Sequence, residues 1–306
     1  MNPAERLREA LSASTSAGAP VVAPGVYDAL TALLVEQAGF KCAYLSGASV
    51  SFTRLGRPDL GLTSMNEVAD TIGNIRERTD ISLVVDADTG FGNALNVKRT
   101  VKLFERMGAS CIQLEDQTLP KRCGHLSGKT LVPVTEMTGK LKAALDARTD
   151  EATMIMARTD ALAVDGIDAA LDRADAYVEA GADILFVEAP ADEAQLKQVA
   201  DRLAAKVPLL VNMVEGGRTP LMPAAKLGEL GFSLVIYPGA MVRVVAKAAT
   251  DYLNVLNTDG TTLNMLDNMF DFSQIMELVG LSEMVSDGQT YSDDIQSATD
   301  HPNYRK

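Results

Sequence analysis

The chain has 306 residues, of which 47% are apolar, so it can bury a sizeable core in one large domain or two small ones. Its formal net charge is −13, which argues against nucleic acid and anionic membranes as partners, because both recruit basic surfaces. Anionic small molecules are still plausible substrates, since a local cluster of cations or a bound metal ion overrides the overall sign.

We expect no secretory leader and no membrane segment. The first residues do not combine a charged start, an apolar stretch and a small-residue cleavage site, and no apolar run approaches the roughly 18–20 residues of a spanning helix. Residues 2–19 have the spacing of a short amphipathic helix followed by a Ser/Ala/Gly connector. The three cysteines, Cys42, Cys111 and Cys123, are an odd and low number, which favours reduced thiols and a cytoplasmic protein.

One pattern recurs along the chain: a helical stretch ends in Gly, a short apolar run follows, and polar residues come next. It occurs in EQAGFKCAYLSG, ERMGASCIQLED, VEAGADILFVEAP and GELGFSLVIYPG. Gly is favoured where a helix ends with positive φ, and an apolar run without alternation is typical of a strand buried on both faces. The segments between the runs have helical spacing, as in the stripe of Val97, Val101 and Phe104.

These runs predict eight strands that alternate with helices. They are Val21–Gly25, Cys42–Ser46, Leu83–Asp88, Cys111–Glu115, Thr153–Ala157, Ile184–Glu188, Leu209–Asn212 and Leu234–Tyr237. Eight βα units favour an α/β fold of the (β/α)8 TIM-barrel type, whereas a doubly wound open sheet lacks support because no Gly-rich phosphate fingerprint follows the first strand.

Three segments exceed an even repeat. Residues 48–66 and 116–135 are long for connections that leave the carboxyl end of a strand, where barrel active sites lie. Residues from about 241 to 306 form more helix than a barrel needs, and could cap the barrel or reach a neighbouring subunit. We therefore predict a single barrel domain over residues 1–306 with a C-terminal helical extension.

Polar residues gather at the carboxyl ends of the predicted strands, which converge on one mouth in a barrel. They are Ser46, Asp86, Asp88, Glu115, Asp116, Arg158, Asp160, Glu188 and Asn212. Several carboxylates at one mouth repel each other unless a cation or protons lie between them. Oxygen ligands favour Mg²⁺, with Mn²⁺ possible, and no His/Cys set has zinc spacing. We predict Asp86 and Asp88 as ligands and Glu115 as a direct or water-mediated one; helix caps and ion pairs with Arg158 and Lys121 are the alternative.

A second candidate feature is the loop LPKRCGHLSGK, residues 119–129, which we call the gating loop. The cations beside Cys123 favour its thiolate, so we expect a depressed pKa for this thiol. Gly124 and Gly128 give the loop freedom to close over an anionic substrate, exclude water and deliver a proton. The alternatives are an exposed basic turn with an incidental Cys, or a zinc ligand pair, for which no second pair exists at useful spacing.

Three further features carry weaker signals. The segment YLSGAS, residues 44–49, ends a strand with a hydroxyl and a Gly whose backbone N–H groups could bind a carboxylate. Arg158 and Arg243 are either carboxylate clamps or ion-pair partners. Cys42 and Cys111 lie at predicted strand starts and are expected to be inert core residues.

Together these motifs resemble the isocitrate lyase/phosphoenolpyruvate mutase superfamily. The matching segments, in the order of the family, are YLSGAS, RPDLG, VVDADTGFGN, QLEDQ, PKRCGHLSGK, MARTDA, FVEAP and NMVEGG. They run from about Val21 to about Arg243, and DADTGFG followed by KRCGH is the most specific combination. Within the superfamily the chain is most similar to the branch of 2-methylisocitrate lyases, 2,3-dimethylmalate lyases and petal-death-type lyases.

The resemblance implies a role for each matched residue. Asp86 and Asp88 would hold Mg²⁺ with support from Asp59 and Glu115, and Cys123 would be the proton donor. The predicted catalytic residues are thus Cys123, Lys121, His125 and Asp59, and the predicted substrate-binding residues are Tyr44, Ser46, Gly47, Ala48, Gly124, Arg158, Glu188, Asn212 and Arg243.

The resemblance also implies a reaction and an assembly. The reaction is a retro-aldol-like cleavage in which Mg²⁺ lowers the pKa of a 2-hydroxyl, the C2–C3 bond breaks, and a thiol protonates the carbanion. The substrate is a small 2-hydroxy di- or tricarboxylate, and pyruvate is a product. The family pattern implies a modified barrel whose C-terminal helix swaps between subunits of a homotetramer, a dimer of dimers.

Two positions depart from the family pattern. Methylisocitrate lyases carry an Arg for the third carboxylate roughly where Phe272 stands, so an alkylmalate substrate is favoured. Gln113 replaces a His that often precedes the Leu-Glu-Asp segment.

Three rival functions stay open. Phosphoenolpyruvate mutases lack the KRCGH loop, but carboxyphosphonoenolpyruvate mutases have a similar one. Oxaloacetate hydrolases or decarboxylases use the same scaffold. A non-enzymatic barrel is the last rival, although an acidic cluster beside a reactive loop serves no obvious packing purpose.

Overall fold

The computed structural model describes residues 1–17, 19–124, 126 and 128–291. The chain divides into two compact units, Met1–Val244 and Val245–Lys306. This boundary lies near residue 241, where the helical extension is predicted to begin, and the prediction of one domain over the whole chain is not tested by it. Among the described residues, no helix combines the length and the apolar character needed to cross a membrane.

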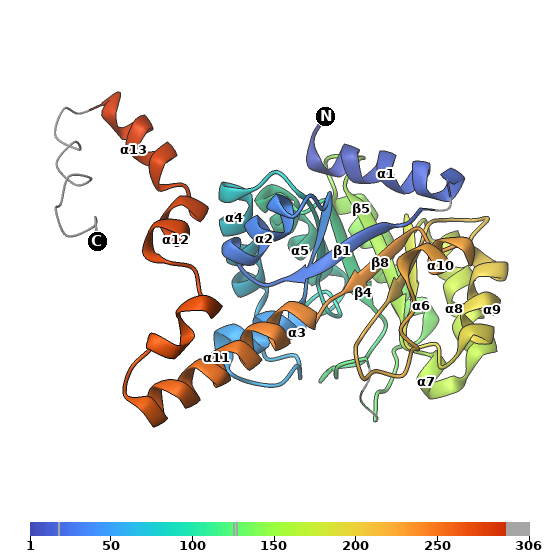
Figure 1. Ribbon diagram of the computed structural model, residues 1–306. Helices are drawn as coiled ribbons and strands as arrows, with labels where there is room; N and C mark the ends of the chain where they lie inside the picture. The colour runs from blue at the N-terminus through green and yellow to red at the C-terminus, as the bar shows by residue number, and fades with distance from the viewer. Residues whose placement is uncertain (18, 125, 127, 292–306) are drawn as a thin grey trace. The chain divides into compact units, whose positions relative to one another are not determined.

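The first unit contains a closed barrel of eight parallel strands, in which β1 pairs with both β2 and β8 (Figure 1). The strands are β1 Val21–Val26, β2 Cys42–Leu45, β3 Ser82–Asp86, β4 Cys111–Glu115, β5 Met154–Thr159, β6 Ile184–Val187, β7 Leu209–Asn212 and β8 Leu234–Tyr237. Every predicted run overlaps one of them, so the predicted (β/α)8 fold class is confirmed. The swap of a C-terminal helix between subunits stays a prediction.

Helices surround the barrel and join its strands. They are α1 Pro3–Ala17, α2 Ala29–Gln37, α3 Gly47–Val50, α4 Met65–Arg78, α5 Ala94–Met107, α6 Val134–Ala147, α7 Leu162–Asp165, α8 Ile167–Glu179, α9 Glu193–Leu203 and α10 Ala224–Glu229, with α11 Ala240–Asp259 beginning in this unit. The glycines of the repeated pattern have positive φ as predicted; Gly108, which ends α5, is at +100°. A side chain there would strain the backbone.

The core has two parts. One lies between the strands and the surrounding helices and includes the predicted stripe of Val97, Val101 and Phe104. The other fills the barrel interior and brings Leu7 and Leu11 of α1 together with strand residues such as Ala23, Cys42 and Cys111. Helix α1 therefore closes the amino-terminal end of the barrel, which leaves the carboxyl ends of the strands as its mouth.

Cys42 and Cys111 belong to this interior cluster and are fully buried, which confirms the prediction that they are core residues. Burial raises the pKa of the Cys42 thiol to about 12 and raises that of Cys111 well above its usual value. Both thiols therefore stay protonated at neutral pH and are shielded from reagents.

The predicted long connection over residues 48–66 is partly helical. Ser46 caps α3 by accepting a hydrogen bond from the Ser49 backbone N–H at 3.2 Å, and a π-helical turn, η1 Ser51–Leu55, follows directly. This arrangement presents the backbone of residues 46–48 as the first turn of a helix.

The described part of the second unit, up to residue 291, is helical. It contains the later part of α11, the 3-10 helix η2 Leu263–Asn268, α12 Phe272–Leu278 and α13 Leu281–Gln289. Phe272, the position that favoured an alkylmalate, begins α12 and is 57% exposed.

Candidate active site

A cavity of about 230 Å³ lies at the mouth of the barrel. It is smaller than the roughly 300–1,000 Å³ of pockets that hold drug-sized ligands, so it suits a small metabolite. Its lining residues are Tyr44, Ser46, Ala48, Phe52, Asp59, Asp86, Glu115, Lys121, Arg122, Cys123, Gly124, Arg158, Glu188, Asn212, Val214, Ile236, Pro238, Gly239 and Arg243.

Most of the predicted site residues thus meet in one cavity, although their roles stay predictions. Gly47 and Asp88 are absent from the lining but contact it, because Gly47 donates its N–H to Asp86 at 3.3 Å and Asp88 is ion-paired with Lys121. His125 lies outside the described residues.

Asp86 and Asp88 face the same point, as the sequence predicts. A Cβ placed on Gly47 would lie 3.1 Å from Asp86 Oδ2 and 3.5 Å from Asp88 Oδ1. The reason differs from the one expected from strand alternation, because β3 ends at Asp86. Asp88 follows in the left-handed region at φ +48° and donates its N–H to Asp86 Oδ1 at 3.2 Å. Such backbone costs on the order of 1–3 kcal/mol in a non-glycine residue and is concentrated at functional sites.

A buried chain of hydrogen bonds orients Asp86. The Gln113 amide donates to Asp86 Oδ1 at 3.1 Å, and the Tyr44 hydroxyl donates to Gln113 Oε1 at 3.0 Å. Burial, followed by the charge of Asp86, raises the pKa of Tyr44 well above its usual value, so the phenol remains a donor. An amide suits this position because it donates on one side and accepts on the other.

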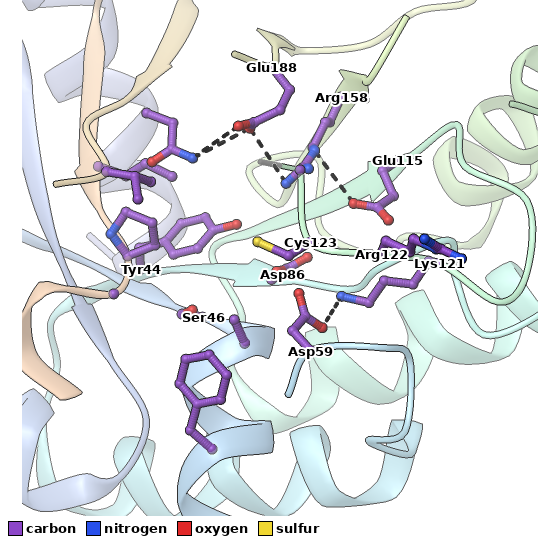
Figure 2. A pocket seen from close by; sticks show the side chains of 18 of the residues that line it. Tyr44, Ser46, Asp59, Asp86, Glu115, Lys121, Arg122, Cys123, Arg158 and Glu188 are labelled. Carbon is purple, nitrogen blue, oxygen red and sulfur yellow. Dashed lines mark hydrogen bonds and ion pairs between the residues drawn. The ribbon is translucent and has the colours of Figure 1, made fainter. Parts of the chain in front are cut away.

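Lys121 lies among the acidic side chains (Figure 2). Its ammonium pairs with Asp59 and with Asp88 Oδ1, the latter at 2.6 Å, and its side chain is 3% exposed. Burial alone would lower the pKa of Lys121, but the surrounding carboxylates, Asp88 foremost, raise it. Asp88 thus forms the ion pair with Lys121 that was weighed as the alternative to a metal site, and its role as a metal ligand stays a prediction.

Arg158, at the end of β5, is held on several sides. Its guanidinium donates two hydrogen bonds to Asp160 at 3.0 and 3.1 Å, approaches Glu115 at 3.4 Å and Glu188 at 3.7 Å, and lies 5.0 Å from the Phe186 ring centroid. Burial opposes the charge, but these carboxylates, Asp160 foremost, raise the pKa of Arg158. A fixed, charged fork is what recognition of a carboxylate requires.

Glu115 has an unsatisfied oxygen. The side chain is 2% exposed, and its Oε1 is among the buried polar atoms without a hydrogen-bond partner in the described part of the chain. Burial raises the pKa of Glu115 well above its usual value, although the charge of Arg158 opposes the shift. Such an atom calls for a ligand or a water molecule.

Two other predicted binding residues have protein partners. Asn212 donates weakly to the Glu188 carboxylate, at 3.4 Å to each oxygen. Arg243 is half-exposed, pairs with the Glu215 carboxylate, and donates to the Glu215 backbone oxygen at 2.7 Å. In this structure Arg243 therefore forms an ion pair, which was the alternative to its role as a carboxylate clamp.

The expectation that Asp116 faces the mouth is wrong. Its carboxylate is fully buried and accepts hydrogen bonds from the Thr159 hydroxyl at 2.7 Å, the Tyr177 hydroxyl at 2.8 Å and the Asp160 backbone N–H at 2.9 Å. Consecutive side chains on a strand point to opposite faces, so Glu115 faces the mouth and Asp116 does not.

The gating loop lies against the mouth. Cys123 is half-buried, and Figure 2 shows its sulfur pointing into the space between Arg158 and Asp86. Gly124 packs so closely that an added Cβ would lie 2.3 Å from Arg158 Nη2 and 2.7 Å from Glu188 Cγ. Only a glycine permits this approach without displacing those side chains.

The sequence reasoning missed two groups of residues. Phe52, Val214, Ile236 and Pro238 give the cavity an apolar wall, which a search for polar strand ends does not find. Lys129, at the end of the gating loop, is buried and paired with Asp160 at 2.7 Å. The second lysine of the KRCGHLSGK motif was a signal, because a lysine in a loop that packs against the barrel needs an acidic partner if it is buried.

The fold and the site define a class: a (β/α)8 barrel enzyme with an acidic cluster, a fixed arginine and a cysteine-bearing loop at its mouth. Residues 11–256 match the family model described as phosphoenolpyruvate phosphomutase. The chain belongs to this family, and membership in the isocitrate lyase/phosphoenolpyruvate mutase superfamily is confirmed.

The chain is also similar to named relatives. A 2,3-dimethylmalate lyase of Eubacterium barkeri is 46% identical over 284 residues, which cover 93% of this chain and 96% of the relative. A 2-methylisocitrate lyase of Shewanella oneidensis is 42% identical over 275 residues, or 90% and 92% of the two chains.

Solved structures agree with this placement. A crystal structure of 2,3-dimethylmalate lyase superposes with a TM-score of 0.89 at 34% identity, covering 96% of this chain and 97% of that one. A structure of oxaloacetate acetylhydrolase with 3,3-difluorooxalacetate superposes with a TM-score of 0.88 at 32% identity, covering 95% of this chain and 98% of that one.

Proposed function

We propose that this chain is a Mg²⁺-dependent carbon–carbon lyase that cleaves a small 2-hydroxy di- or tricarboxylate to pyruvate and a second carboxylate. The substrate class is that of 2,3-dimethylmalate or 2-methylisocitrate, the substrates in the names of its relatives. The observation that carries the proposal is the meeting of Asp86, Arg158 and Cys123 in one small cavity.

The acidic residues present fit a magnesium ion. Asp86 Oδ2 and Asp88 Oδ1 face the same point beside Gly47, and Glu115 Oε1 is a buried oxygen without a partner in the described residues. No ready-made cage of three His, Cys, Asp or Glu side chains exists in residues 1–17, 19–124, 126 and 128–291. That suits Mg²⁺, which keeps several waters and uses one or two carboxylates.

Asp86 and Asp88 would hold the ion, with Glu115 and Asp59 as direct or water-mediated support. When bound, Mg²⁺ supplies Lewis acidity that lowers the pKa of the substrate hydroxyl. Lys121, which now pairs with Asp88, would then turn its ammonium toward the anionic substrate and stabilise the negative charge that develops.

Side chains and backbone groups of the protein carry out the remaining steps of the reaction. Arg158 and the backbone of residues 46–48 bind the carboxylate that becomes part of pyruvate. The 2-hydroxyl loses its proton to the acidic cluster, the C2–C3 bond breaks, and its electron pair stays on C3. The Cys123 thiol donates a proton to C3, and the resulting thiolate regains one from the cluster or from solvent. The gating loop excludes water while the carbanion exists.

The apolar wall supports an alkyl-substituted substrate. Phe52, Val214, Ile236 and Pro238 present no charged group to a third carboxylate, whereas an alkyl group gains from burial against them. Phe272 in place of an arginine favours the same choice, so we place alkylmalates ahead of 2-methylisocitrate. We further propose a cytoplasmic homotetramer, as the resemblance implies.

A coupled assay tests the proposal. Purified protein with Mg²⁺ is offered 2,3-dimethylmalate, other alkylmalates, 2-methylisocitrate, carboxyphosphonoenolpyruvate and oxaloacetate; pyruvate is detected with lactate dehydrogenase, and consumption of each substrate is followed by NMR. Pyruvate is expected from an alkylmalate or from 2-methylisocitrate. The Cys123→Ser protein, purified in parallel, excludes a contaminating lyase.

Two results would overturn the lyase assignment. Turnover of oxaloacetate alone would point to the hydrolase that the second superposed structure represents. Turnover of carboxyphosphonoenolpyruvate without pyruvate from any hydroxy acid would point to the mutase branch.

A further inference from the structure

The gating loop is attached to the barrel at defined places. Its two ends pair through an isolated antiparallel bridge between Gln117 and Leu131, and the Thr118 N–H donates to the Thr130 carbonyl at 2.8 Å. On the outgoing side, the Gln117 side chain bonds both backbone groups of Arg122, at 2.8 and 2.9 Å. These contacts fix the base of the loop, and the ion pairs of Lys121 with Asp59 and Asp88 hold its outgoing side.

On the return side of the loop, the Lys129 side chain points back towards the segment that carries Cys123. Its ammonium donates to the backbone oxygen of Gly124 and to Asp160 Oδ1, the latter at 2.7 Å. The side chain of Lys129 is 1% exposed and that of Asp160 is fully buried. Lysine is rarely this well enclosed, and a buried ammonium group requires hydrogen-bonding partners of this kind.

Asp160 is also the residue that orients Arg158. Its Oδ1 accepts from both Lys129 and Arg158, and its Oδ2 accepts from Arg158 alone. The backbone of Asp160 is fixed in turn, because its N–H donates to Asp116 Oδ1 at 2.9 Å. Burial would raise the pKa of Asp160, but the charges of Arg158 and Lys129 lower it, so the carboxylate is ionised.

We propose, on the basis of the proposed lyase function, that Lys129 is a positioning residue that latches the gating loop shut. It does so by joining Gly124, the residue next to Cys123, to the carboxylate that orients Arg158. The closed position of the thiol and the orientation of the arginine therefore depend on one shared carboxylate. Lys129 is not itself a lining residue of the cavity, and its hydrogen-bond partners are Gly124 and Asp160 rather than the predicted metal ligands, so it acts through the groups it holds.

The three thiols give a direct measure of latching that needs no turnover. Cys42 and Cys111 are fully buried with raised pKa values, whereas Cys123 is half-buried in the loop. Iodoacetamide at pH 8 should therefore alkylate Cys123 selectively, at a rate that increases when the loop opens. Peptide mass mapping identifies the modified thiol, and unfolding in urea exposes all three as a reference.

The test compares the alkylation rate of Cys123 in the wild type, Lys129→Met and Lys140→Met. Lys140 is a matched control, because it is another buried lysine, 5% exposed at its side chain, but it contacts Glu136 and the Thr89 carbonyl rather than the loop. Lys129→Met should raise the rate at least about fivefold, since removing one partner of a buried ion pair leaves the other uncompensated. Lys140→Met should leave the rate unchanged even where it lowers the melting temperature.

A wild-type alkylation rate in folded Lys129→Met would overturn the latch, and so would an equal increase in Lys140→Met. If Lys129→Met does not fold, Lys129→Gln decides, because its amide can keep one of the two contacts; an increased rate supports the latch and an unchanged rate overturns it. None of these measurements depends on pyruvate release. A failure of the latch proposal can therefore be distinguished from a failure of the lyase assignment.

Discussion

Cys123 owes its proposed role to its surroundings. The residues before it supply positive charge, the residue after it packs against Arg158, and the loop places the sulfur above the acidic cluster (Figure 2). A thiol in that position can give a proton to a carbanion, whereas the hydroxyl of serine is a much weaker acid.

Replacing this sulfur tests the assignment of the proton donor. We expect Cys123→Ser to lower kcat by at least about tenfold with little change in substrate affinity, because general acid catalysis contributes roughly 10²–10⁴-fold. Steady-state kinetics and calorimetric titration of the substrate would separate the two quantities. Wild-type turnover in this variant would remove Cys123 from the mechanism.

For single residues, the sequence predicts which side chains lie near the site better than it predicts the directions in which they point. Asp86, Glu115 and Arg158 could be predicted because polar side chains at buried strand ends are costly without a purpose. Asp116 was misplaced because neighbouring residues on a strand face opposite sides, and a one-residue difference decides which side is the mouth. The partner of Lys129 could not be predicted, since Asp160 is distant in sequence and only the fold brings the two together.

The gating loop is the element on which the proposed mechanism depends most. Its closed position requires a residue without a side chain where it crosses Arg158 and Glu188, and Gly124 fills that requirement. The loop is therefore restricted by sterics at Gly124 as well as by its anchoring contacts.

A methyl group at this crossing should hold the loop open. We expect Gly124→Ala to lower kcat/KM at least about tenfold, since misplacement of a catalytic group by even 1 Å costs on the order of 100-fold. The matched control is Gly139→Ala in α6, where an added Cβ meets nothing within 4 Å and the helix should become about 0.5–1 kcal/mol more stable. Kinetics and urea unfolding of both variants would test this, and equal activities would show that the loop closes in another way.

Helix α1 is an element whose role is structural. Leu7 and Leu11 are each 1% exposed and close the barrel interior at the end away from the mouth. We expect Leu7→Ala to destabilise the fold by roughly 2–5 kcal/mol while kcat and KM at low temperature stay unchanged. Urea denaturation measures the first quantity. A large change in KM would mean that the two ends of the barrel are coupled.

Elements of regular length were predictable and short ones were not. Four strands could be predicted from a helix-ending Gly followed by a short apolar run, and the others from the apolar run alone, because such runs between helical segments have few other structural solutions. The turns of α3 and η1 could not, since four or five residues are too few to show a helical period. The end of β3 was misjudged because the left-handed turn at Asp88 leaves no apolar signal.

For the whole molecule, the count of strands determined the fold. Eight βα units close into a barrel with α1 at one end (Figure 1), and the acidic cavity lies at the carboxyl ends of the strands. The net charge of −13 repels an anionic substrate from the molecule as a whole. Only the cations at the site itself can therefore attract the substrate. Subunit exchange of a helix and assembly into a tetramer are properties of several chains, and they stay predictions.

A bound divalent ion would neutralise the acidic cluster and would thereby stabilise the folded barrel. We expect millimolar Mg²⁺ to raise the melting temperature of the metal-free wild type, since a ligand at 100 times its Kd stabilises by about 2.7 kcal/mol. Asp86→Asn should respond far less, and NaCl at matched ionic strength should not reproduce the effect. Equal shifts in both proteins would place the ion elsewhere.

The most direct test of the central claim is pyruvate release from the preferred hydroxy acid as free Mg²⁺ is varied from full chelation to millimolar concentrations. We predict no turnover in the chelator, saturation as the ion is restored, and at least about 100-fold more Mg²⁺ needed by Asp86→Asn, in line with the loss expected when a metal's ligand set is disrupted. Undiminished turnover after exhaustive chelation would contradict the proposal that a cation at the barrel mouth activates the substrate.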